Sequence, residues 1–170
     1  VVGVVLSSTL CAYGFARLRF PGRDLVFIIM LASMMLPSQV TVIPAYILFH
    51  RIGWLGTFKP LIIPAWFGGG AFNIFLMRQF FTSVPADLVD AARIDGASRL
   101  RTWWKIMLPL SKPALTAITV FTVQGVWNDF FGPLIYLNSK NKMTLALALQ
   151  VFQTVAGSIQ LQSQYQDIAL

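Results

Sequence analysis

The chain has 170 residues, of which 56% are hydrophobic and 11% are charged, and 13 Lys and Arg against six acidic residues give a net charge of +7. A soluble domain has about 25% charged residues, so a soluble protein of this composition would expose large apolar patches. Disordered chains are polar and poor in aromatic residues, and nucleic-acid binders lack such an apolar background. We therefore expect an all-α, polytopic helical membrane protein, because helices satisfy their backbone hydrogen bonds inside a bilayer.

Apolar segments that could cross a membrane recur along the chain, and each crossing needs about 20 mostly apolar residues. They cover residues 1–16, 25–49, 60–81 and 110–137, and another begins at 167. Pro37 and Pro44 interrupt the second segment, where we expect kinks. The Gly68–Gly70 triplet in the third predicts close helix packing. Because the first segment is short and starts without Met, we interpret the chain as a fragment cut at both ends, forming one transmembrane domain over 1–170.

The connection 82–108 is long, polar and helical in pattern. Ser83 is a candidate cap for a helix whose first turn holds Pro85. We expect Gly96 to end this helix with a positive φ, and Ser98 to cap a second, basic helix that carries two tryptophans. The pattern therefore predicts two short helices that meet at an angle.

Basic residues are distributed unevenly among the connections. The connection 17–24 and the region 82–108 with its borders hold nine Lys and Arg, whereas 51–59 and 138–166 hold four. Basic residues concentrate in cytoplasmic loops of membrane proteins. We therefore expect 17–24 and 82–108 to face the cytoplasm.

The order of residues within 82–108 is more specific than its charge. It resembles the Glu-Ala-Ala signature of permease subunits of bacterial ABC importers, which reads Glu-Ala-Ala, three residues, Gly, nine residues, Ile, any residue and Leu-Pro. The matching residues here, at the same spacing, are Asp90-Ala91-Ala92, Gly96, Ile106 and Leu108-Pro109. Asp90 replaces the family's Glu, which keeps the charge and shortens its reach. Other stretches resemble the carbohydrate-uptake branch, which includes maltose-type and glycerol-3-phosphate-type permeases: residues 12–22, 75–81, 108–114 and 127–134.

The resemblance implies a type I ABC importer permease core in the bacterial cytoplasmic membrane, without enzymatic activity or a cofactor. It implies as partners a cytoplasmic ATP-binding subunit, a second homologous permease subunit and an extracytoplasmic substrate-binding protein, besides membrane lipid. The implied cargo is a sugar, a polyol or glycerol-3-phosphate. The chain has no Gly-x-x-x-x-Gly-Lys-Ser/Thr phosphate loop, so ATP hydrolysis is expected on the separate subunit. Asp90, Ala91, Ala92 and Gly96 are the expected contacts with that subunit.

Three polar side chains in the apolar segments, Gln39, Asn73 and Gln124, are candidates for lining the transport pathway. Each needs a hydrogen-bond partner or water at that depth, so hydrogen bonding between helices is the alternative interpretation. The glutamine-rich segment 150–166 faces the side from which cargo arrives. A solvated loop and a contact with the substrate-binding protein both fit it.

Two other function classes remain open at this point. A non-enzymatic membrane scaffold would have spans and a basic loop, but no reason for the signature spacing. An autonomous secondary transporter usually needs deep acidic residues, and Asp129 lies 20 residues after Pro109, roughly 30 Å along a helix and therefore near the outer interface. The single Cys and single His offer no cluster of metal ligands.

Overall fold

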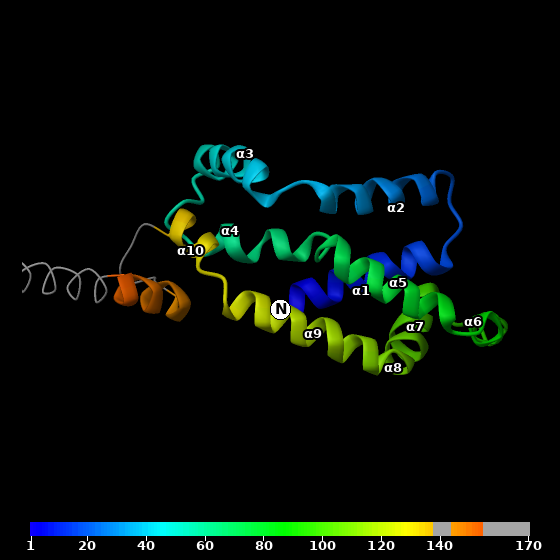
Figure 1. The fold of residues 1–170 in the computed structure, drawn as a ribbon. Helices are drawn as coiled ribbons and strands as arrows, with labels where there is room; N and C mark the ends of the chain where they lie inside the picture. The colour runs from blue at the N-terminus through cyan, green and yellow to red at the C-terminus, as the bar shows by residue number, and fades with distance from the viewer. Residues whose placement is uncertain (138–143, 155–170) are drawn as a thin grey trace, which may run out of the picture.

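The computed structural model describes residues 1–137 and 144–154, and every regular element in these ranges is a helix. The prediction of an all-α protein is confirmed. A central rod, α5 (Ala71–Ser83), contacts α1 (Val2–Arg17), α2 (Arg23–Ala32) and α9 (Lys112–Trp127). These rods lie side by side and make up the body of the molecule (Figure 1).

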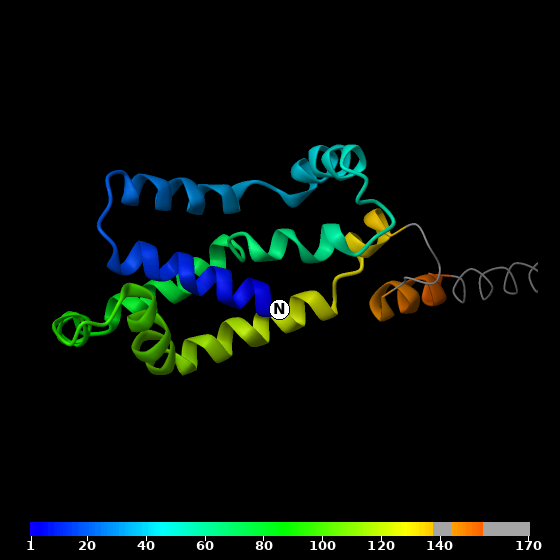
Figure 2. The same cartoon turned by 180° about the vertical axis from the view of Figure 1, so that it is seen from behind.

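The chain runs back and forth between the two ends of this bundle (Figures 1 and 2). At one end lie the turn 18–22 and four short elements: α6 (Ala86–Ile94), α7 (Arg99–Thr102), the π-helical turn η3 (Trp103–Met107) and α8 (Leu108–Leu110). At the other end lie α3 (Ser38–Arg51), α4 (Lys59–Ile62), α10 (Phe131–Tyr136) and a further helix, Leu145–Thr154. The first end, here called the basic end, therefore holds both connections that the charge distribution assigns to the cytoplasm.

The predicted segment 25–49 is divided at Pro37. Helix α2 continues through a 3-10 turn, η1 (Ser33–Met35), and α3 follows at an angle of 101°. Proline disfavours helical geometry in the residue before it, and Leu36 is extended, with φ −76° and ψ 123°. Pro44 lies inside α3 without ending it. The segment thus consists of two helices with a sharp bend at Pro37, one of the two prolines where we expect kinks.

Lys59–Ser83 is long and apolar enough to cross a membrane by itself, and it is the single such helix in the described ranges. If each of two sharply bent helix pairs is counted as one span, the number of candidate spans rises to three. Within it, α4 and a 3-10 turn, η2 (Pro64–Trp66), precede the glycine triplet and α5. Gly69 has a φ of +60°, and a Cβ there would lie 2.3 Å from the carbonyl oxygen of Val4 and 2.9 Å from Cβ of Ser8. Glycine therefore lets α1 approach closely, as predicted from the triplet.

The predicted segment 110–137 also differs from a single span, because α9 ends at Trp127. The Asp129 carboxylate accepts a hydrogen bond from the backbone N–H of Gly132 at 3.0 Å, which supports the start of α10. The backbone N–H of Gly56 donates to the carbonyl of Tyr136 at 2.9 Å and joins α10 to the neighbouring connection. Asp129 is therefore at the end of the bundle opposite the basic end. The start of a span predicted at 167 lies outside the described residues.

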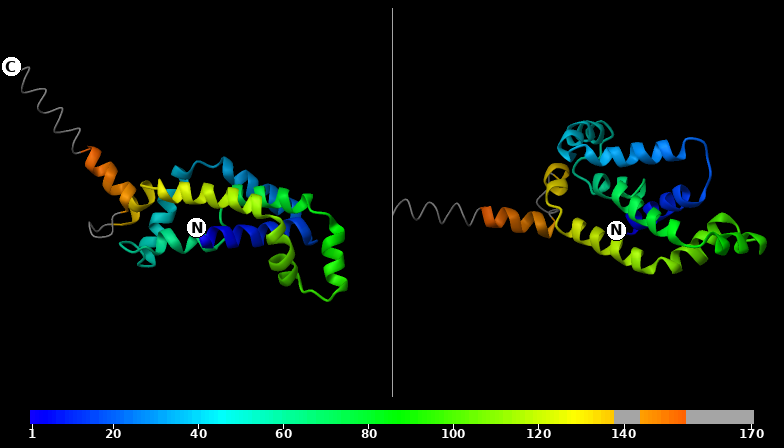
Figure 3. Two further views of the ribbon diagram at one scale, coloured as in Figure 1. Left: turned by 90° about the horizontal axis from the view of Figure 1, so that it is seen from below. Right: turned by 45° about the vertical axis from the view of Figure 1, so that its right-hand side comes forward.

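The main core lies between α1, α5 and α9 and continues into the short helices of the basic end. Its buried residues are Ala12, Tyr13, Ile74, Met77, Phe81, Val84, Val89, Trp103, Met107, Ala114 and Ile118. Figure 3 shows α6 and α7 running across the direction of the rods at this end. Since Val89 and Trp103 belong to the same core as the rods, the position of these short helices is fixed by packing against the bundle.

Candidate functional site

Helix α6 carries the signature residues and projects beyond the rods at the basic end (Figures 1 and 3). Val89 and Ala92 point into the protein and are 4% and 6% exposed. Leu88 and Ile94 are 45% and 87% exposed, and Ala91 is exposed beside them. This outer face of α6, defined by Leu88, Ala91 and Ile94, is an apolar surface that the rest of the described chain leaves uncovered.

The start of α6 is held differently from the predicted cap. The Ser83 hydroxyl donates back to the carbonyl of Phe80 at 2.7 Å, and no side chain caps α6. The prediction of a Ser83 cap is therefore wrong, because α5 runs to Ser83 and the hydroxyl serves its last turn. Instead, the Arg17 guanidinium at the end of α1 donates to the carbonyl of Phe81 at 2.6 Å and to that of Val84. Arg17 thus ties α1 to the junction between α5 and α6.

The end of α6 follows the sequence prediction. Gly96 has a φ of +76°, the left-handed geometry that glycine adopts readily. Its N–H donates to the carbonyl of Arg93 at 3.0 Å, and the N–H of Ala97 donates to that of Ala92 at 2.9 Å, which is the pattern of a Schellman cap. The Ser98 hydroxyl accepts from the N–H of Arg101 at 3.3 Å and caps α7, as predicted. Gly96 and Ser98 together set the direction of α7.

Of the two neighbouring tryptophans after Ser98, one is exposed and the other is buried. Trp104 is largely exposed, which suits a membrane interface. Trp103 is buried in the main core against α6. Neighbouring residues on a helix point in different directions, so one of the two tryptophans can be buried while the other is exposed. The sequence did not indicate which of them is buried, and a π-helical turn begins at Trp103.

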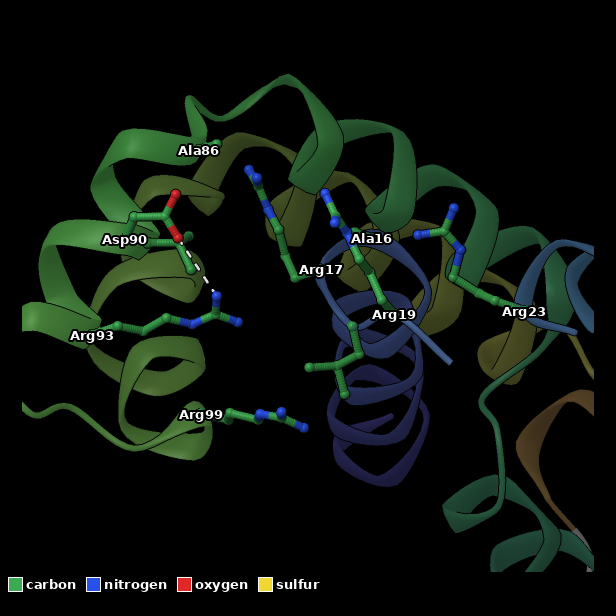
Figure 4. Close-up of a pocket in the computed structure, with 10 residues that line it drawn as sticks. Ala16, Arg17, Arg19, Arg23, Ala86, Asp90, Arg93 and Arg99 are labelled. Carbon is green, nitrogen blue, oxygen red and sulfur yellow. Dashed lines mark hydrogen bonds and ion pairs between the residues drawn. The ribbon is translucent and has the colours of Figure 1, made fainter. Parts of the chain in front are cut away.

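A hollow of about 520 Å³ lies between α6 and the end of α1 (Figure 4). It is lined by Ala16, Arg17, Leu18, Arg19, Arg23, Ala86, Val89, Asp90, Arg93 and Arg99. Asp90 lies at its edge, and its carboxylate is 3.5 Å from the Arg93 guanidinium, one turn further along α6. Both side chains are exposed, so this ion pair is weak, on the order of 0–1 kcal/mol.

The three candidate pathway residues are not brought together. Asn73 donates from Nδ2 to the carbonyl of Gly69 at 3.0 Å and to the hydroxyl of Thr122 at 3.4 Å, which links α5 to α9. Gln124 is exposed on α9. Gln39 lies in the first turn of α3, on the opposite side of the bundle from α9 (Figures 1 and 2). The contacts of Asn73 match the alternative of hydrogen bonding between helices, and a pathway role for the three stays a prediction.

Comparison with known proteins places these features in a family. Residues 4–164 match the family described as the binding-protein-dependent transport system inner membrane component. A probable ABC transporter permease of Pyrococcus horikoshii is 40% identical over 144 residues, which are 84% of this chain and 51% of that protein. The diacetylchitobiose uptake system permease NgcG of Streptomyces coelicolor is 33% identical over 149 residues, 88% of this chain and 49% of that protein.

A third relative and a solved structure agree with these matches. The sn-glycerol-3-phosphate transport system permease UgpE of Yersinia pestis is 34% identical over 157 residues, 92% of this chain and 55% of that protein. A bacterial ABC transporter that imports the acidic polysaccharide alginate matches with a TM-score of 0.81 and 30% identity, over 95% of this chain and 59% of that one. The chain therefore spans about half the length of the curated relatives it matches. It belongs to the family of inner membrane components of binding-protein-dependent transport systems.

Proposed function

We propose that this chain is part of the transmembrane subunit of an ATP-driven importer, and that a separate ATP-binding subunit acts on it through α6. The observation that carries the proposal is the outer face of α6, an apolar surface on a short helix that projects from the end assigned to the cytoplasm. An exposed apolar surface marks a site of interaction with another protein or with a membrane. This one lies in the polar connection 82–108, outside the apolar segments, so a protein partner suits it better. Hydrolysis of ATP then takes place on the partner.

The four signature residues take different parts in the proposed contact. Ala91 lies on the outer face and meets the partner, whereas buried Ala92 holds α6 against the bundle. Gly96 fixes the turn into α7. Asp90 exchanges its weak pair with Arg93 for a basic group on the ATP-binding subunit, which costs little because both side chains are already in water.

Two links carry a displacement of α6 to the rods. Val89 packs α6 into the main core beside Trp103 and Met107, and Arg17 joins the α5–α6 junction to α1. A packed interface shifts between discrete arrangements rather than deforming continuously. ATP-driven movement of α6 therefore switches the rods between two arrangements, together with a second homologous permease subunit.

The proposed cargo is a sugar or a related solute delivered by an extracytoplasmic substrate-binding protein. The names of the relatives support this class, since they refer to diacetylchitobiose, sn-glycerol-3-phosphate and alginate. The segment 150–166 stays a prediction for contact with the binding protein. Of this segment, residues 150–154 belong to a helix and the others lie outside the described residues.

The proposal is tested with Leu88→Ser in the full-length protein, compared with Ile52→Ser at the opposite end, since the two side chains are 45% and 46% exposed. Burial of half a leucine side chain is worth about 1 kcal/mol, so Leu88→Ser should weaken binding of the ATP-binding subunit about fivefold. Co-purification from membranes measures the binding, and ATP-driven sugar uptake by proteoliposomes measures the function. Equal retention and uptake in both variants would contradict a contact at α6, and uptake without ATP would contradict the importer.

A further inference from the structure

The hollow beside α6 has an unusual concentration of positive charge. Five guanidinium groups line it, and Asp90 is the single carboxylate among its lining residues (Figure 4). Arg17 comes from the end of α1, Arg19 from the turn after it and Arg23 from the start of α2, whereas Arg93 and Arg99 come from α6 and α7. Like charges held this close repel one another, and the cost is relieved by an anion between them. Its volume of about 520 Å³ falls within the roughly 300–1,000 Å³ usual for small-molecule sites.

Carboxylates of the chain neutralise this charge only in part. Arg23 pairs with Asp24 at 2.9 Å, a hydrogen bond that lowers the pKa of the Asp24 carboxyl and keeps it ionised. Arg17 donates to backbone carbonyls, which bear no net charge, and its Nε is buried without a hydrogen-bond partner in the structure described. Among the residues placed by the structure, no carboxylate pairs with Arg19 or Arg99. The hollow therefore keeps a net positive charge and unused N–H donors.

A second hollow adjoins the first at the start of α2, where exposed apolar residues begin. This second hollow of about 360 Å³ shares Arg19 and Arg23 with the first and is otherwise lined by Phe20, Gly22, Asp24 and Leu25. From Leu25 the exposed flank of α2 continues with Ile28 and Ile29. In an inner membrane protein, such a flank suits acyl chains. A basic hollow and an apolar flank thus lie next to each other at the end of the rods.

We propose that this hollow binds the phosphate headgroup of an anionic phospholipid from the cytoplasmic leaflet, with the acyl chains of the lipid along the exposed flank of α2. Arginine forks bind phosphate oxygens through paired, charge-assisted hydrogen bonds. The cytoplasmic leaflet is rich in anionic lipids and attracts basic groups at its surface. The lipid joins the start of α2 to α6 and α7, and so supports α6 from the membrane side.

An acidic segment of a partner protein is the competing occupant, and its position is less suitable. The hollow lies between α6 and the end of α1, where buried Val89 lines it and exposed Asp90 lies at its edge. The outer face, with Leu88 and Ile94, is directed elsewhere. The proposed lipid site requires that the chain be embedded in a membrane, and it holds whether or not α6 binds an ATP-binding subunit.

The test uses the full-length protein in nanodiscs of phosphatidylcholine mixed with phosphatidylglycerol, with the retained lipids counted by native mass spectrometry. Wild type should retain phosphatidylglycerol in preference to phosphatidylcholine. Since each arginine near an anionic surface contributes about a fivefold gain in affinity, Arg19→Gln with Arg99→Gln should weaken retention about 25-fold. Arg101→Gln, on α7 but outside the hollow, should retain the lipid as wild type does.

The outcomes separate the possible occupants. Equal retention of phosphatidylglycerol by wild type and the double variant would overturn the proposal. So would a wild type that retains phosphatidylglycerol and phosphatidylcholine equally, and this measurement does not depend on the folding of any variant. Inorganic phosphate added to phosphatidylcholine discs tests a free anion: thermal stabilisation by phosphate without any preference for phosphatidylglycerol would overturn the lipid assignment. Displacement of the lipid by the ATP-binding subunit would assign the hollow to an acidic segment of that partner.

Discussion

Gly96 shows how much one residue decides at the basic end. A Cβ at this position would meet no atom within 4 Å, so space does not limit the residue type. The restriction comes from the φ of +76° alone, which costs an L-residue about 1–2 kcal/mol. Substitution at Gly96 therefore changes the turn between α6 and α7 without disturbing the core.

Gly96→Val should uncouple ATP hydrolysis from transport, because valine disfavours the left-handed turn and α6 then leaves its direction relative to α7. Gly96→Asn is the matched control, since asparagine tolerates this geometry better than other side chains. The ratio of sugar uptake to ATP hydrolysis by the assembled transporter should fall for valine and change little for asparagine. Wild-type uptake by the valine variant would show that the turn has no part in coupling.

Residues whose role depends on near neighbours were predictable from the sequence, and residues with distant partners were not. Gly96 and Ser98 act within one turn of helix, so the local pattern indicated both the positive φ and the cap. Arg17 bonds to carbonyls 64 and 67 positions away, and the sequence presented it only as part of a basic connection. The predicted cap at Ser83 was wrong because this residue lies between the end of α5 and the start of α6, and its hydroxyl bonds to the last turn of α5.

At the scale of elements, α5 and α9 are joined by the hydrogen bond between Asn73 and Thr122. Such bonds between membrane helices contribute about 0.6 kcal/mol on average, because the separated helices also find partners. Asn73 also bonds to the Gly69 carbonyl at the break before α5. The side chain thus stabilises the point where a regular rod begins.

A double-mutant cycle with Asn73→Ala and Thr122→Val should show a coupling of about 0.6 kcal/mol. Unfolding of the purified protein in detergent measures it. The comparison cycle pairs Thr122→Val with Gln124→Leu, whose effects should simply add, because side chains two positions apart on one helix do not face each other. Additive effects in the first cycle would remove the helix-pairing role and return Asn73 to the pathway candidates.

The existence of these helices could be predicted from apolar length, but their directions could not. Pro37 predicted a break in the helix, since proline disfavours helical geometry in the residue directly before it. The angle of 101° between α2 and α3 depends on what each helix packs against, so the local sequence does not predict it. The same holds for α9, whose end at Trp127 is followed by a separate α10 within the predicted segment 110–137.

At the scale of the whole molecule, the fold gathers basic residues from distant parts of the chain at one end. The connection after α1 and the helices α6–α8 meet there, as the charge distribution predicts for two connections on one side of a membrane (Figure 1). The composition gave the class of protein and the signature gave the family. The hollow between the two connections emerged only from the arrangement of the rods.

Orientation is measurable because Cys11 is the single cysteine of the chain. On a full-length background in which Cys11 and every cysteine outside residues 1–170 are replaced by Ala, Arg101→Cys in α7 should react with an impermeant maleimide only after the membrane is opened. Ile52→Cys, after α3 at the opposite end, should react in intact cells once the outer barrier is permeable to the reagent. The reverse pattern of labelling would invert the assignment of the basic end to the cytoplasm.

The bend of 101° between α2 and α3 has a consequence for the lipid around this protein. The rod on that side consists of 10 residues in α2 and three in η1, about 20 Å along a helix, whereas the hydrocarbon core of a bilayer is about 30 Å thick. Wherever lipid contacts this flank, the hydrophobic mismatch is met by local thinning, at fractions of a kcal/mol per Å. The bend at Pro37 thereby makes the stability of this face depend on acyl-chain length.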